Sequence, residues 1–421
     1  MTATFAGLPR FPVPTSYDSR RESPVMQPDP LKEPGWKESD MKYAFTHATI
    51  LDGSAEMEPQ EDMTLLVDDA GKIAEIGPSS TTRVPPETRT VDLRGAFLMP
   101  GLINMHVHLT GTGEPISAGG ASKLIDFVLA NPLGRAYIRR RIRKNAETAF
   151  MSGTTTVRGV GDPAWCDIAV RNSIEKRRIL GPRLLVSGWG VTPPEGHGRG
   201  LIAKQCDTVE DAVELTREIA KHDADLVKLF ITGGVYDSEV AGEFGIVRMS
   251  QEMADAVVAE AHGLGLSTAT HVESREGVRI ALRAGVDTIE HGSVLDDEMI
   301  GLFRENGAGR KSCLVCTLSP AMPLSRMDPK KTHSTDVVKA NADGLAEEMI
   351  EGVKRARELG IDIGLGTDAG CPYIPPYDMW RELVYFHEII GADTRETLHR
   401  ATAVNARLLG IDKVTGTVEV G

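Results

Sequence analysis

The chain has 421 residues, of which 41% are hydrophobic and 25% charged, and its net charge is −13 at pH 7. This length favours one large domain with a smaller accessory domain, and the composition is that of a globular protein with a sizeable core. The negative charge argues against a nucleic-acid or anionic-membrane partner, and no apolar run reaches the roughly 18–20 residues of a membrane span.

Two features bear on the cellular compartment. Residues 1–40 are rich in proline and polar residues and lack the apolar core of a secretory signal, so we expect an extended arm. The cysteines are odd in number and scattered, which indicates reduced thiols and a cytoplasmic protein. They are Cys166, Cys206, Cys313, Cys316 and Cys371.

Residues 41–97 show short strand patterns separated by turns. Four segments fit, namely 43–53, 63–69, 71–78 and 90–95. Apolar and β-branched residues bounded by Gly, Asp and Pro are typical of strands joined by tight turns. This part of the chain therefore predicts a small antiparallel β unit.

Between residues 98 and 411 the pattern changes to strands alternating with helices. Eight apolar segments are strand candidates: 102–109, 154–159, 183–188, 226–234, 266–272, 286–292, 311–318 and 362–370. Amphipathic helical segments lie between most of them, for example 207–222, 249–264 and 337–359. Eight such units predict an α/β fold with a closed (β/α)8 TIM barrel. An open doubly wound sheet fits less well, because no Gly-rich phosphate-binding motif follows the first strand.

Polar residues occupy the ends of the predicted barrel strands. His106 and His108 end the first strand, and their spacing puts both side chains on one face. His271, His291 and Asp368 end the fifth, sixth and eighth strands. The carboxyl ends of barrel strands meet at one mouth, so we expect these side chains to converge there. Imidazole and carboxylate ligands together suit zinc or a similar divalent ion.

Lys228 lies inside the fourth predicted strand, between Val227 and Leu229. A buried ammonium is costly, and burial favours the neutral amine. A neutral amine can add carbon dioxide, and the resulting carbamate has two oxygens, enough to bridge two metal ions. The alternative is a lysine that extends its amine to the barrel mouth.

The sequence resembles the amidohydrolase superfamily in its binuclear branch, on the motifs MPGLINMHVHL, GTTTVRG, VKLFITGG, ATHVES, IEHGS and LGTDAG. The resemblance implies two divalent ions, expected to be zinc, with His106, His108 and Asp368 on one ion and His271 and His291 on the other. Carbamylated Lys228 and a hydroxide would bridge the ions. Asp368 would be the catalytic residue that moves the proton from the nucleophile to the leaving nitrogen.

The segments GTTTVRGVGD and VKLFITGG are most similar to the imidazolonepropionase-related group, which contains prolidase-like dipeptidases and ochratoxin-type amidases. The resemblance implies hydrolysis of the amide bond of a small substrate, a dipeptide or an N-acyl amino acid. His197 and Tyr236, on loops after the third and fourth strands, are the expected substrate contacts. A cyclic-amide hydrolase or a deaminase on the same scaffold is the alternative, and Glu273 would then be a catalytic candidate.

The resemblance also implies a small β-sandwich composite domain. It would combine residues 41–97 with C-terminal strands from about 412–421, and the barrel would span 98–411. We further expect a homo-oligomer. Cys313 and Cys316 form an isolated C-x-x-C whose thiols point to opposite faces of a strand, so we predict neither a metal site nor a redox site there.

Overall fold

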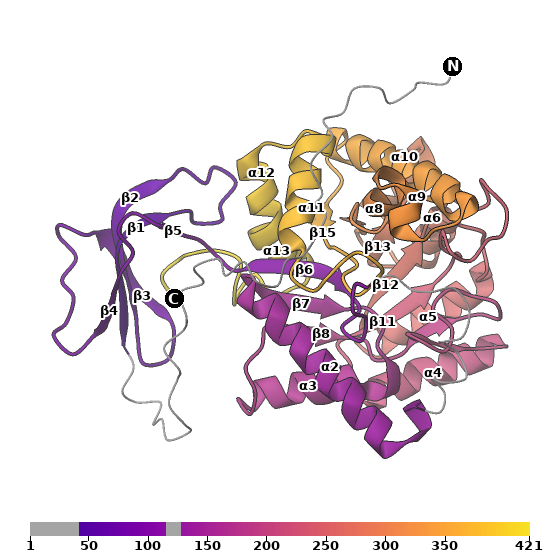
Figure 1. Ribbon diagram of the computed structural model, residues 1–421, viewed down its shortest axis with the longest axis horizontal. Helices are drawn as coiled ribbons and strands as arrows, with labels where there is room; N and C mark the ends of the chain where they lie inside the picture. Colours follow the sequence, from indigo (N-terminus) through magenta and orange to yellow (C-terminus); the bar gives the residue numbers. More distant parts are fainter. Residues whose placement is uncertain (1–41, 115–127) are drawn as a thin grey trace.

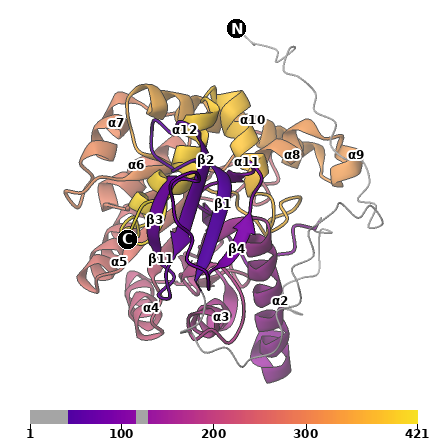
Figure 2. The same ribbon diagram turned by 90° about the vertical axis from the view of Figure 1, so that its left-hand side faces the viewer.

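The computed structural model describes residues 42–114 and 128–421, so the predicted N-terminal arm lies outside the described residues. Figure 1 shows a small β-sheet beside a larger α/β body, with the C-terminus close to the small sheet. Turned by 90°, the small sheet stands in front of the larger body (Figure 2). All the predicted metal ligands lie in the larger body.

The small sheet has the order β3-β2-β1-β4, with β5 also paired to β1. The β1–β2 and β2–β3 pairs are antiparallel, but β4 and β5 run parallel to β1. The expected antiparallel unit is therefore a mixed sheet, because the chain crosses over after β3 and returns along β1. Its strands are β1 (Tyr43–Ile50), β2 (Gln60–Val67), β3 (Ile73–Pro78), β4 (Arg89–Asp92) and β5 (Phe97–Leu98).

The strands expected at about 412–421 do not form. This segment instead contacts the small sheet through separate backbone hydrogen bonds, from Val418 N to Asp52 O at 2.8 Å and from Gly421 N to Ile73 O at 2.9 Å. The Val418 side chain packs with Ile50 in the core of the small sheet. Two isolated bonds do not make a ladder, so the segment covers the sheet without adding a strand. The composite domain and its boundaries remain predictions.

Each of the eight predicted barrel segments contains a strand. Together with two further short strands, β9 and β10, they form two parallel sheets, β6-β7-β8 and β10-β9-β11-β12-β13-β14-β15. The α/β class with parallel strands is thereby confirmed. The strands are β6 (Leu102–Val107), β7 (Thr154–Gly159), β8 (Arg183–Val186), β9 (Gly190–Thr192), β10 (Ala203–Gln205), β11 (Leu226–Phe230), β12 (Ser267–Val272), β13 (Thr288–His291), β14 (Cys313–Cys316) and β15 (Ile363–Leu365).

The two parallel sheets meet at two seams. Past the end of β15, Asp368 N donates to His106 O at 2.8 Å, and His108 N donates to Ala369 O at 2.7 Å. At the other seam, Asp225 N, just before β11, donates to Val186 O at 2.8 Å. These bonds bring β6 beside β15 and β8 beside β11 without continuing the ladders. Closure of all eight strands into one hydrogen-bonded barrel therefore stays a prediction.

Helices cover the outside of the parallel strands (Figure 1). The three helical segments expected at 207–222, 249–264 and 337–359 correspond to α4, α5 and α10, and α4 begins at a reciprocal cap between Thr208 and Asp211. Within the described ranges, none of the helices has the length and apolar character needed to cross a membrane. The helices are α2 (Pro132–Met151), α3 (Cys166–Glu175), α4 (Val209–Lys221), α5 (Gln251–Gly263), α6 (Arg275–Ala284), α7 (Asp297–Arg304), α8 (Ala321–Arg326), α9 (Pro329–Thr332), α10 (Asp336–Glu358), α11 (Met379–Tyr385), α12 (Thr394–His399) and α13 (Asn405–Leu408), with one-turn or π segments η2 (Pro163–Trp165), η3 (Phe386–Ile390) and η4 (Arg400–Val404).

Candidate active site

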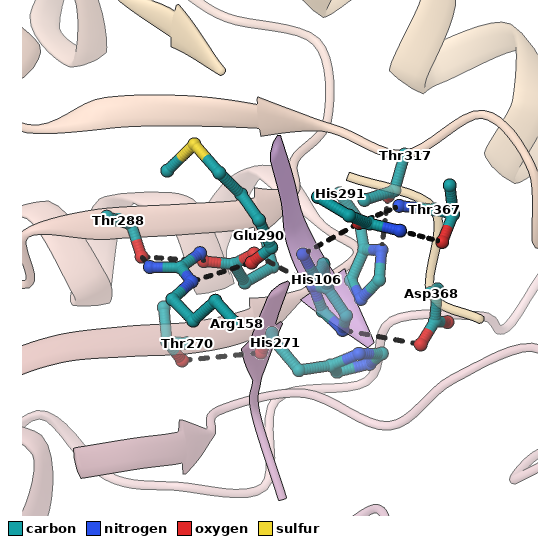
Figure 3. Close-up of polar contacts among 12 residues, drawn as sticks. His106, Arg158, Thr270, His271, Thr288, Glu290, His291, Thr317, Thr367 and Asp368 are labelled. Atoms are coloured by element: carbon teal, nitrogen blue, oxygen red, sulfur yellow. Dashed lines mark hydrogen bonds and ion pairs between the residues drawn. The ribbon is translucent and has the colours of Figure 1, made fainter. Parts of the chain in front are cut away.

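His106 and His108 face the same carboxylate at the end of β6. The Nε2 atom of each ring lies 3.3 Å from Asp368 Oδ1. The other nitrogen of each ring, Nδ1, has a hydrogen-bond partner. His106 Nδ1 contacts Glu290 Oε2 at 2.8 Å, and His108 Nδ1 donates to Gly161 O at 2.8 Å. With Nδ1 bonded in this way, both Nε2 atoms are directed at Asp368, and Figure 3 shows this contact for His106. The alternation expected for this pair places both rings on one face.

His271 and His291 complete a cluster of rings around His106. The His106 and His291 ring centroids are 4.9 Å apart, and those of His271 and His291 are 4.7 Å apart. His291 Nδ1 is bonded to Thr317 Oγ1 at 2.7 Å, which leaves its Nε2 free for a ligand. Burial lowers the pKa of His271 and of His291 well below the usual value, so both rings are neutral, as metal ligands must be.

Two residues of the cluster have a backbone conformation that is rare for side chains other than glycine. His291 has a φ of 66° and Asp368 a φ of 59°. In a regular strand, His291 would point away from the face that Glu290 occupies. The left-handed turn at His291 instead lets both side chains reach the interior, on opposite sides of His106 (Figure 3). Such strained residues are frequent at functional sites.

Lys228 is fully buried in the middle of β11. Its Nζ atom has no hydrogen-bond partner among the described residues and lies 5.0 Å from the Phe230 ring centroid. Burial lowers the pKa of the amine to about 8. The lowered pKa increases the share of neutral amine at neutral pH, and the neutral amine is the form that adds carbon dioxide.

The donor atoms fit divalent ions. Four buried polar atoms of this cluster have no hydrogen-bond partner in the described parts of the chain: His106 Nε2, Lys228 Nζ, Glu273 Oε2 and Asp368 Oδ1. Two sets of three residues have ligand atoms within 4.8 Å of one another, namely His106, His291 and Asp368, and His271, Glu273 and His291. His106 Nε2 and Asp368 Oδ1 lie 3.3 Å apart without forming a hydrogen bond, and buried nitrogen and oxygen atoms in this state are costly unless a cation binds them.

Neighbouring histidines stabilise the ionised form of Asp368. Burial alone would favour the protonated acid, but the contacts with His106 and His108 keep the pKa of Asp368 well below its usual value. Asp368 N is also bonded to His106 O at 2.8 Å, which fixes the backbone at the end of β15. An ionised carboxylate therefore faces both histidine rings.

A buried ion pair between Arg158 and Glu290 supports the cluster through the contact of Glu290 with His106. This pair was not predicted from the sequence. Glu290 is bonded to Arg158 Nη2 at 2.7 Å and to Thr288 Oγ1 at 2.6 Å, besides its contact with His106. Burial raises the pKa of Glu290, but Arg158 and His106 outweigh burial and hold that pKa well below the usual value. The available signal was a charged residue inside an apolar strand pattern, as at Lys228.

The two expected substrate contacts differ in their surroundings. The His197 ring stacks on His271 with centroids 4.3 Å apart, and His197 Nδ1 contacts Asp237 Oδ2 at 2.5 Å. Asp237 also accepts a hydrogen bond from Gly234 N at 2.8 Å, and the sequence analysis had not identified it. Tyr236 is 48% exposed on the same loop. His197 thus lies beside a predicted metal ligand, and the role of Tyr236 stays a prediction.

The two cysteines of the C-x-x-C lie in different parts of the core. Cys313 packs with Met105, and Cys316 belongs to the main hydrophobic core, where its Sγ lies 3.5 Å from Glu382 Oε1. Both thiols are free. Because the thiols face different neighbours, this pair does not form a shared metal or redox site.

Comparison with known proteins places this geometry in a family. Residues 97–421 match the family model described as the amidohydrolase family. The ochratoxinase of Aspergillus niger is 24% identical to this chain over 432 residues, which cover 94% of this chain and 82% of that protein.

Two solved structures extend the similarity over nearly the whole chain. A candidate prolidase from Bifidobacterium longum is 38% identical, with a TM-score of 0.79 over 91% of this chain and 87% of that one. A Xaa-Pro dipeptidase with methionine bound in its active site is 27% identical, with a TM-score of 0.77 over 90% of this chain and 91% of that one.

Proposed function

This chain belongs to the amidohydrolase family, and from that premise we propose that it cleaves the amide bond of a dipeptide or an N-acyl amino acid and releases an amino acid. The observation that carries the proposal is the convergence of four histidines and Asp368 near the carboxyl ends of the parallel strands, with the buried Lys228 inside the neighbouring strand β11. The 38% identity to a candidate prolidase supports the same reaction class.

The proposed metal ligands divide between two ions. His106, His108 and Asp368 would hold one ion, His271 and His291 the other, and a carbamate on Lys228 would bridge them. The unpartnered Nε2, Nζ and Oδ1 atoms support this assignment. When bound, divalent ions such as zinc supply a nucleophilic hydroxide at neutral pH and polarise the substrate carbonyl.

Asp368 would act as the general base and acid. Its ionised carboxylate accepts the proton of the nucleophile and then delivers it to the nitrogen that leaves. Its left-handed backbone and the bond from Asp368 N to His106 O hold the carboxylate in place during both transfers. Glu290 and Gly161 hold the rings of His106 and His108 by their Nδ1 atoms, so that the Nε2 atoms stay directed at the ligand position.

His197 and Tyr236 would bind the substrate. His197 is oriented by Asp237 through Nδ1 and stacks on His271, so its Nε2 would be the atom that contacts a substrate carbonyl or carboxylate. Tyr236 extends from the neighbouring loop and is half-exposed, as a residue that contacts an incoming ligand would be. Neither side chain is required to hold a metal ion.

The remaining parts of the proposal concern architecture and context. The eight parallel strands would close into a (β/α)8 barrel, and the small sheet with residues 412–421 would form the composite domain. We also propose a cytoplasmic homo-oligomer with a small-molecule amide substrate. Hydrogen bonds across both seams of the parallel strands support the closure.

The test is an assay of the zinc-loaded protein with Xaa-Pro and other dipeptides, N-acyl amino acids, lactams and aminopyrimidines, with products identified by mass. Two fragments, one of them a free amino acid, are the expected result. Loss of ammonia, or addition of water without fragmentation, would overturn the proposal and favour a deaminase or a cyclic-amide hydrolase.

A further inference from the structure

Glu273 is a buried carboxylate at the mouth to which no role has yet been assigned. It follows the end of β12, two residues after His271, and is 5% exposed. Its Oε2 has no hydrogen-bond partner among the described residues, and its Oε1 lies 3.9 Å from His271 Nε2. Val235 N is hydrogen-bonded to this carboxylate, but the buried Oε2 is left without a partner in the described parts of the chain, so its position calls for a ligand that donates to it.

The backbone of Glu273 is held in position by two neighbouring segments. Glu273 N donates to Thr232 Oγ1 at 3.0 Å. The chain at Gly245 passes so close that a Cβ there would lie 2.2 Å from Glu273 O. The residue is therefore held from two sides by the segments that follow β11. A group positioned so firmly is suited to selecting a ligand.

The charges around Glu273 leave it without a counter-ion. The nearest cationic candidate in the described ranges is His271, which must be neutral if it ligates a metal. The other two carboxylates that act on Glu273 are already engaged, Asp237 by His197 and Gly234 N, and Asp368 by His106 and His108. Of the three carboxylates, Glu273 is the one whose contact with a histidine, 3.9 Å, is longer than a hydrogen bond.

We propose that Glu273 binds the free α-ammonium group of a dipeptide substrate, so that the enzyme prefers dipeptides with a free amino terminus to N-acyl amino acids. This inference rests on the proposed amide hydrolysis. In a dipeptide, a single carbon separates the α-ammonium nitrogen from the scissile carbonyl carbon. A carbonyl held beside His271 and His291 therefore brings the ammonium to Glu273, whose ligand atoms belong to the same set.

Acylation of the substrate nitrogen removes this interaction. An acylated nitrogen is neutral and carries one N–H, so it offers Glu273 neither a positive charge nor the three donors of an ammonium group. Sites built around a buried polar group reject ligands that leave that group unpaired. The competing role for Glu273 is that of a third ligand to the metal ion at His271 and His291.

The test compares the wild type, Glu273→Gln and the control Glu243→Gln, which removes an exposed carboxylate from a neighbouring loop. The substrates are alanyl-proline and N-acetyl-alanyl-proline, and zinc content is measured for each protein. For Glu273→Gln we expect KM for alanyl-proline to rise at least about tenfold. We expect an unchanged or lower KM for the acetylated substrate and unchanged zinc content. Glu243→Gln is expected to match the wild type.

Three results would overturn the proposal: loss of zinc in Glu273→Gln, equal losses with both substrates, or a wild type without preference for the free amine. Binding of L-methionine and N-acetyl-L-methionine, measured by calorimetry on the zinc-loaded proteins, keeps the test independent of turnover. Tighter binding of methionine that Glu273→Gln abolishes would support the role of Glu273 even if neither substrate is cleaved. The absence of cleavage would count against the proposed function, and equal binding of both ligands against the role of Glu273.

Discussion

Glu290 Oε2 lies 2.8 Å from His106 Nδ1, although the two residues are 184 positions apart in the chain. The same carboxylate is bonded to Arg158 through its other oxygen. His106 is therefore held in one tautomer and one ring orientation by a residue that would not itself touch a metal ion. Residues in this position tune ligand basicity and geometry.

Glu290→Gln is expected to weaken metal binding by about 10- to 100-fold, because it removes the charge that orients His106. It should also lower the free energy of unfolding by about 3–5 kcal/mol, because Arg158 loses its buried partner. Zinc affinity and urea unfolding measure the two effects.

Thr288→Val is the matched control for this prediction. It removes the bonds to Glu290 Oε1 and from Arg158 Nη1 but leaves the contact between Glu290 and His106. It should lower stability by about 1 kcal/mol with near-normal zinc affinity. Equal zinc affinity in Glu290→Gln and the wild type would contradict an orienting role.

Lys228→Ala is expected to lower zinc content and activity together, because the proposed bridge between the ions is lost. Lys228→Met keeps most of the side-chain volume and should also be inactive. Its metal-free form should be at least as stable as the wild type, because a buried amine is replaced by an apolar group. Activity near the wild-type level in either variant would exclude the carbamate.

Asp368→Asn is expected to reduce kcat by at least about 100-fold while the fold is retained, because the amide cannot accept the proton of the nucleophile. The assay is run at saturating zinc, and circular dichroism checks the fold. A kcat close to that of the wild type would remove Asp368 from proton transfer.

Glu382, a buried carboxylate that is not among the proposed metal ligands, makes stability depend on pH. Burial raises its pKa to about 7, although Leu318 N and Ser319 N donate to its carboxylate at 2.7 and 2.8 Å. A group that binds its proton more tightly in the folded state stabilises the fold below its unfolded pKa, 4.5 for Glu382. That contribution, up to about 3 kcal/mol, is lost as pH rises toward 7.

Urea unfolding of the wild type and Glu382→Gln between pH 4.5 and 7.5 measures this effect. The stability of the wild type relative to the variant should fall as pH rises across the window, because only the wild type carries the Glu382 carboxyl group. A constant difference would show that Glu382 keeps the same pKa in both states.

Much of the site was predictable because it follows from strand geometry. The alternation of side chains placed His106 and His108 on one face, and the shared mouth of parallel strands predicted that Asp368 would join them. Lys228 was recognisable because an amine inside an apolar strand needs a reason. These inferences use only local periodicity and the direction of the strands.

Other features depend on tertiary contacts that leave no local signal. The left-handed turn at His291, which lets Glu290 and His291 both face inward, occurs without a glycine. The partner of Glu290 is Arg158, which lies on a strand far away in sequence. The parallel pairing of β4 with β1 also depends on contacts between segments that are separated in the chain. Residues 412–421 likewise form no strand, because only isolated backbone hydrogen bonds join them to the small sheet.

The most direct test of the account is a zinc titration of metal-free protein, with bound metal per chain and dipeptide hydrolysis measured on the same samples. The account predicts no cleavage without metal and cleavage that rises until two ions are bound per chain. Cleavage by metal-free protein, or full activity with one ion per chain, would contradict it.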